Sequence, residues 1–96
     1  MARYRILHWK DIPSLVEAID GDRVARVPLS QRFQDLIDAV AMREGATDTE
    51  AYLEGWGQGP DLDRDGDPNA VAEAVAAEIE AMFPDLMAAR FLPRPT

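Results

Sequence analysis

The stretch LVEAIDGDRVARVPL, residues 15–29, carries the main signal for the fold. Two runs rich in β-branched residues, 15–19 and 23–29, flank the turn sequence Asp-Gly-Asp at 20–22. An Asp-Gly pair between two such runs is a strong hairpin signal, because both residues accept the backbone angles of a tight turn. Residues 3–9 carry apolar bulk at both alternating sets of positions, which is typical of a central strand. We therefore predict a three-stranded antiparallel meander.

The rest of the chain has the periodicity of helices. Apolar residues recur at helical spacing after Ser30, a typical N-cap residue, and Gly45 is expected to end that helix. Either Thr47 or Asp48 caps a short second helix that ends near Gly55. A third helix starts at residues 67–68, where aspartate precedes a proline suited to the first helical position.

A last short turn or helix is expected over residues 85–91. A meander followed by three to four helices predicts an α+β fold, a two-layer sandwich with the helices packed on one face of the sheet. The 96 residues suffice for one small domain, which we place at residues 1–92. Residues 93–96 are expected to form a flexible tail.

Composition excludes several classes of function. A formal net charge of −8 repels phosphate backbones and anionic lipid surfaces, which disfavours nucleic-acid and membrane binding. The chain has no cysteine and one histidine, so thiolate metal sites and multi-histidine sites are excluded. It shows neither a signal-peptide pattern nor an apolar run long enough to span a bilayer. These features predict a cytoplasmic protein.

Residues 61–66, DLDRDG, are the most motif-like stretch. Asp61, Asp63 and Asp65 stand at the first, third and fifth positions of a calcium loop. The twelfth position, which must supply a bidentate carboxylate, is Ala72. The stretch therefore has two interpretations, a weak calcium site and a solvated acidic loop that caps the following helix, of which the second is favoured.

Catalytic residues are not indicated by any arrangement in the sequence. His8 is the only side chain that titrates near neutrality, and it is expected to be a structural residue on a sheet face. Asp35 and Asp38 are three residues apart on a helix and fit a solvated face. We therefore assign neither a catalytic residue nor a cofactor, and the sequence favours a non-enzymatic protein over an enzyme.

Trp9 and Trp56 both stand beside turn or loop signals, so each can be a core residue or an exposed interface anchor. Arg3, Arg5 and Lys10 make the first strand basic within an acidic chain. That charge can orient an acidic partner, or it can pair internally with the acidic loop.

Several short blocks resemble one family. WKDIP (9–13), LSQRFQ (29–34), AMREG (41–45) and YLEGW (52–56) are together similar to the small bacterial "virulence factor" domain family, over about residues 3–82. The resemblance implies no catalytic residues. It implies an aromatic residue at the position of His8, where this chain departs from the pattern. It also implies an accessory role, since standalone members accompany genes of corrinoid- and folate-linked methyl transfer.

Together these observations favour a non-enzymatic accessory protein that binds a partner protein. The resemblance makes a methyltransferase or a corrinoid protein the expected partner, and a homodimer is compatible with the small size. The alternatives are binding of a folate-like small molecule, a role as an enzyme subunit, and weak calcium binding. The candidate partner-binding residues are Trp9, Lys10, Asp11, Arg32, Arg43, Tyr52 and Trp56.

Overall fold

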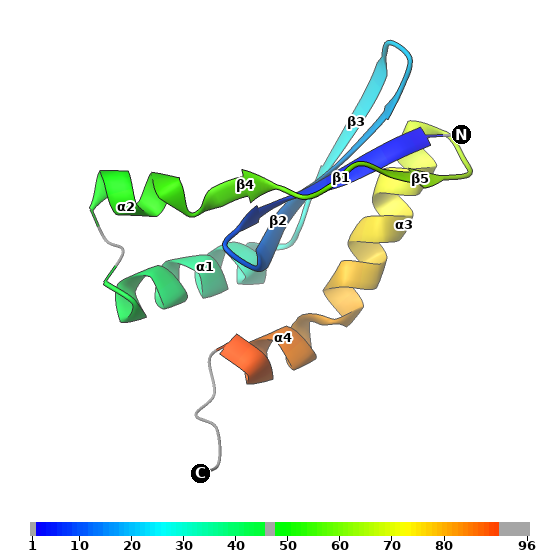
Figure 1. Ribbon diagram of the computed structural model, residues 1–96. Helices are drawn as coiled ribbons and strands as arrows, with labels where there is room; N and C mark the ends of the chain where they lie inside the picture. Colours follow the sequence, from blue (N-terminus) through cyan, green and yellow to red (C-terminus); the bar gives the residue numbers. More distant parts are fainter. Residues whose placement is uncertain (1, 46–47, 91–96) are drawn as a thin grey trace.

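The computed structural model describes residues 2–45 and 48–90 (Figure 1). Its elements follow the order predicted for the α+β class, with two additional short strands after the second helix. They are β1 (Ala2–Trp9), β2 (Ile12–Asp20), β3 (Arg23–Pro28), α1 (Gln31–Arg43), α2 (Thr49–Glu54), β4 (Trp56–Gln58), β5 (Leu62–Arg64), α3 (Pro68–Ala81) and α4 (Phe83–Arg90).

The sheet has five antiparallel strands rather than the three that we predicted. The meander β1–β2–β3 is present, and β4 and β5 both pair with the far edge of β1. β4 pairs with Leu7–Trp9 of β1, and β5 pairs with the first three residues of that strand. The two short strands satisfy backbone groups that the meander leaves unpaired on β1. β1 is therefore a central strand, as its pattern predicts.

Both hairpin turns of the meander are two residues long. Asp20 pairs with Arg23, and Gly21 lies between them with a φ of 63°. A glycine with positive φ at the first central position is the requirement of a type II′ turn. In the first turn Trp9 pairs with Ile12, and Lys10 adopts a φ of 53° although it has a side chain. The predicted Asp-Gly hairpin is therefore confirmed.

The apolar core has two clusters. In the first, α3 packs small and β-branched residues, such as Val71 and Val75, against Val16 and Ala18 of the sheet. In the second, α1 packs its apolar stripe against the β1–β2 turn and Phe83. α3 contacts three neighbouring strands of the meander and so covers one face of the sheet (Figure 1). A two-layer arrangement of all the helices stays a prediction.

Ser30, Asp48 and Asp67 occupy the N-cap positions of α1, α2 and α3, as the sequence predicts, and two of the three cap through their side chains. The carboxylates of Asp48 and Asp67 accept backbone hydrogen bonds at the starts of α2 and α3. Ser30 occupies the N-cap position of α1, but its hydroxyl and backbone N–H donate to the Glu80 carboxylate instead. Thr47, Phe91 and the predicted tail lie outside the described residues. None of the described helices is long and apolar enough to cross a membrane.

Candidate functional site

Three aromatic side chains meet where β1, α2 and β4 come together. Trp9 stacks on Tyr52 with ring centroids 5.7 Å apart, and Tyr52 meets Trp56 edge to face at 6.0 Å. Trp9 and Trp56 are also direct cross-strand partners, which explains why the two tryptophans converge. We call Trp9, Tyr52 and Trp56 the aromatic triad.

Trp9 belongs to the core, which settles one of the two interpretations left open by the sequence. Its side chain is completely buried, and its indole N–H donates a 2.7 Å hydrogen bond to the backbone carbonyl of Tyr52. A Cβ at Gly55 would overlap the indole ring, so only glycine fits there. A buried indole cannot contact a partner, and the partner-binding assignment of Trp9 is therefore corrected. Tyr52 and Trp56 are half-buried and keep part of their surface exposed.

Lys10 is presented beside the triad by a constrained turn. Its backbone N–H donates to the carbonyl of Gly55 at 2.7 Å, which holds the positive φ in place. Its ammonium contacts the Glu44 carboxylate at 2.6 Å and lies 5.0 Å from the centre of the Trp9 ring. The pair is exposed on both sides, so Lys10 is accessible while its charge is balanced.

The structure gathers most of the seven predicted partner-binding residues at this end of the sheet. Asp11 is exposed next to Lys10, and Arg43 is exposed at the end of α1 beside Glu44. Arg32 lies elsewhere. Its guanidinium donates to the Glu80 carboxylate at 3.0 Å and lies 4.4 Å from the centre of the Phe83 ring. Arg32 therefore joins α1 to α3 and α4 and is not part of the group.

A cleft of about 590 Å³ opens between the sheet and the last two helices. Its walls are largely apolar and come from β1, β2, α1, α3, α4 and the segment after β4, while Lys10, Asp11 and Asp85 also line it. His8 forms part of the wall, and its Nδ1 atom is buried with no hydrogen-bond partner among the described residues. The sequence indicated His8 as a structural residue and gave no signal for the cleft, because its walls come from segments that are far apart in the sequence.

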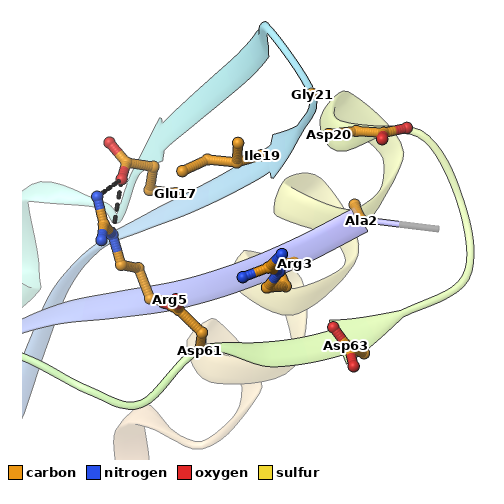
Figure 2. Close-up of a pocket in the computed structure, with 9 residues that line it drawn as sticks. All are labelled: Ala2, Arg3, Arg5, Glu17, Ile19, Asp20, Gly21, Asp61 and Asp63. Atoms are coloured by element: carbon orange, nitrogen blue, oxygen red, sulfur yellow. Dashed lines mark hydrogen bonds and ion pairs between the residues drawn. The ribbon is translucent and has the colours of Figure 1, made fainter.

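On the face of the sheet turned away from α3, Glu17 is almost completely buried and contacts two arginines, of which Figure 2 shows Arg5. Arg5 donates to one carboxylate oxygen at 2.8 Å, and Arg26 donates to the other at 2.6 Å. The hydrogen bond from Arg26 lowers the pKa of Glu17, burial opposes this, and Arg5 lowers the pKa further. The basic charge of Arg5 is therefore paired within the sheet, with Glu17 of β2 and not with the acidic loop that the sequence suggested.

The predicted acidic loop is partly a strand. Leu62–Arg64 forms β5, and Asp61 and Asp63 line a cavity of about 470 Å³ together with Arg3 and Arg5 (Figure 2). Within residues 2–45 and 48–90, no group of three or more acidic or histidine side chains is placed to hold a metal ion. The extended pairing of Leu62–Arg64 with β1 favours the interpretation without calcium, and weak calcium binding by Asp61, Asp63 and Asp65 stays a prediction.

A comparison with protein families gives a match to the model described as "Virulence factor" over residues 7–90. The chain belongs to the virulence factor family. The match includes the aromatic triad, the Lys10 turn and the residues that line the cleft except Ile6, whereas Arg3 and Arg5 lie before it. The same comparisons find no matching curated protein and no matching solved structure. Membership in the virulence factor family confirms the resemblance found in the sequence, and its description names no reaction and no ligand.

Proposed function

We propose that this member of the virulence factor family is a non-enzymatic accessory protein that binds a partner protein in the cytoplasm. The observation that carries the proposal is the gathering of Lys10, Tyr52 and Trp56 at one end of the sheet. Aromatic residues with a charged rim are the usual composition of binding hot spots. Helices α1 and α2 at this end also expose Met42 (72%) and Leu53 (59%) to solvent.

The buried residue of the triad, Trp9, holds the two partly exposed residues, Tyr52 and Trp56, in place. Trp9 is fixed by its hydrogen bond to the Tyr52 carbonyl and by the close approach of Gly55, so the tyrosine and Trp56 rest on a rigid base. Rigid aromatic side chains lose little conformational entropy on binding, which favours affinity. The resemblance adds the expected partner class, a methyltransferase or corrinoid protein of one-carbon metabolism.

The test is affinity capture of the tagged chain from its native bacterium, read by mass spectrometry. We expect one dominant partner with the unmodified chain, and loss of that partner with Leu53→Lys. This substitution changes an exposed side chain on α2 and should leave the fold intact, which circular dichroism can verify.

The matched control is Val24→Lys, which places the same charge at a 51% exposed position on β3, in another part of the molecule. Val24→Lys should retain the partner. Equal capture by both variants, or the absence of any stoichiometric partner under gentle washing, would contradict a docking surface at the triad. Capture of a partner that does not handle methyl groups would contradict only the assigned partner class.

The alternative function, binding of a small molecule, is supported by a different observation. The cleft beside His8 has the size and the apolar walls of a ligand site, and it does not include Tyr52 or Trp56. The two functions are compatible, because an accessory protein can present a bound molecule to its partner.

A further inference from the structure

The cleft between β1 and helices α3 and α4 has the features of a small-molecule site. Its volume of about 590 Å³ falls within the range of roughly 300–1,000 Å³ that such sites occupy. The sheet contributes Ile6, His8 and Pro13 to its walls, and the helices contribute Phe33, Ile79 and Leu86. These side chains are broad and apolar, so they suit a flat hydrocarbon or aromatic body rather than a polar one.

His8 adds a polar group to this apolar wall. Its Nδ1 atom has no hydrogen-bond partner among the described residues, and burial without a partner is unfavourable for such an atom. The residue opposite His8 on β4 is Gly57, and a Cβ there would stand 3.4 Å from the imidazole Cε1. The glycine therefore leaves space beside the ring. Because Nδ1 has no partner, a rotation of the ring costs no hydrogen bond at that atom and can present it to a bound group.

Charge at the cleft selects against anions. Asp85 lines the cleft, and Lys10, the one cation among the described residues that line it, has its charge balanced by Glu44 at 2.6 Å. The whole chain adds to the effect through its net charge of −8. A carboxylate or phosphate group at this place would be repelled, whereas an amide, an amine or an amidine would be tolerated.

We propose that this cleft binds a flat, aromatic, uncharged or cationic organic molecule that hydrogen-bonds to His8. The proposal rests on the alternative function and names its ligand class, and the cleft shares Lys10 but neither Tyr52 nor Trp56 with the surface proposed for partner binding. A side chain from a partner protein is the competing occupant. The unpaired imidazole nitrogen favours the small molecule, because an aliphatic anchor would leave that nitrogen without a partner.

The test uses three probes with one ring system, 2-naphthamide, 2-naphthamidine and 2-naphthoate, with N-acetyl-leucinamide as a mimic of an aliphatic anchor. Each is titrated into the full ¹⁵N-labelled chain, and the amide chemical shifts give the site and the affinity. The amide and the amidine should produce saturable shifts in β1, in the β1–β2 turn and at the α3–α4 junction. We expect 2-naphthoate to bind roughly tenfold more weakly, because its charge meets the Asp85 carboxylate and the negative net charge of the chain.

Two substitutions in the cleft and one control outside it distinguish a loss of ligand binding from a loss of folding. His8→Phe keeps a planar ring but removes its nitrogens, and it should weaken binding of 2-naphthamide severalfold. Met82→Trp adds bulk at a cleft residue that is 60% exposed, and it should abolish binding. Val24→Trp introduces the same side chain at an exposed position on β3 outside the cleft and should leave the affinity unchanged.

Three outcomes overturn the proposal. These are the absence of saturable shifts with the amide and the amidine, an unchanged affinity in folded Met82→Trp, and binding of N-acetyl-leucinamide at least as tight as that of 2-naphthamide. The last result would assign the cleft to a partner's side chain. None of them bears on capture of a partner through Leu53, so failure here is distinguishable from failure of the proposed accessory function.

Discussion

Glu17 is the one carboxylate of the described chain that is buried within the sheet, and its two arginine partners make it a test of stability. Glu17→Gln should lower the free energy of unfolding by about 1–2 kcal/mol at pH 7, since it weakens two charge-assisted hydrogen bonds. We expect a loss at the lower end of this range, because Arg26 is 65% exposed and solvent screens its ion pair with Glu17. Urea denaturation of both proteins measures the difference.

The pH dependence of that difference follows from the direction of the pKa shift. In the folded protein the pKa of Glu17 lies below its ordinary value of 4.5, chiefly because of the hydrogen bond from Arg26. A lowered folded-state pKa means that the stabilisation is complete above the unfolded pKa and is lost as the pH falls through the folded pKa. The difference in the free energy of unfolding between the unmodified chain and Glu17→Gln should therefore disappear at acidic pH. Glu73→Gln, at an exposed position on α3, should show no such difference.

A substitution at Gly55 tests how closely the backbone of this residue approaches the Trp9 ring of the aromatic triad. Gly55→Ala should lower the free energy of unfolding by about 1–3 kcal/mol, because its Cβ would overlap the Trp9 ring and force the core to shift. Gly59→Ala is the matched control, since a Cβ there stays 3.5 Å from the nearest atom, the Ile6 carbonyl oxygen. Equal stability losses in the two variants would contradict a specific clash with Trp9.

At the scale of elements, β5 takes up part of the acidic stretch at residues 61–66, and we therefore expect this stretch not to bind calcium. Leu62–Arg64 pairs with the start of β1, and Arg64 donates to the Glu78 carboxylate of α3 at 2.8 and 3.0 Å. Millimolar calcium should therefore leave the Tm unchanged relative to sodium chloride of equal ionic strength. A site that bound calcium only in the folded state would raise the Tm with concentration, and such a rise would support the calcium interpretation of the acidic stretch.

The elements that the sequence predicts are those whose signals are local. The Asp-Gly hairpin, the apolar stripe of α1 and the Asp67-Pro68 start of α3 each lie within one segment, and each is confirmed. β4 and β5 were missed because a three-residue strand has no periodicity of its own and exists only through its pairing with β1. The cleft and the Glu17 cluster were missed for the same reason, since both depend on which strands become neighbours.

At the scale of the whole molecule, the two core clusters are joined by shared contacts. Leu29 and Ile79 are half-buried and pack against both the cluster around α1 and the cluster around α3. The Glu80 carboxylate adds a polar connection, because it accepts hydrogen bonds from Ser30 and Arg32 at the start of α1. These contacts across the two clusters indicate that the domain unfolds as one cooperative unit.

Val75→Ala tests that cooperativity. It removes two methyl groups from the α3 cluster, where Val75 is 4% exposed, and should lower the free energy of unfolding by about 1–3 kcal/mol. If unfolding is cooperative, native-state hydrogen exchange should show the same loss in the most protected amides of α1, although α1 does not belong to that cluster. Val24→Ala, at an exposed position, should leave both regions unchanged. A loss confined to α3 and the sheet would mean that the two clusters unfold independently, and that the contacts of Leu29, Ile79 and Glu80 do not couple them.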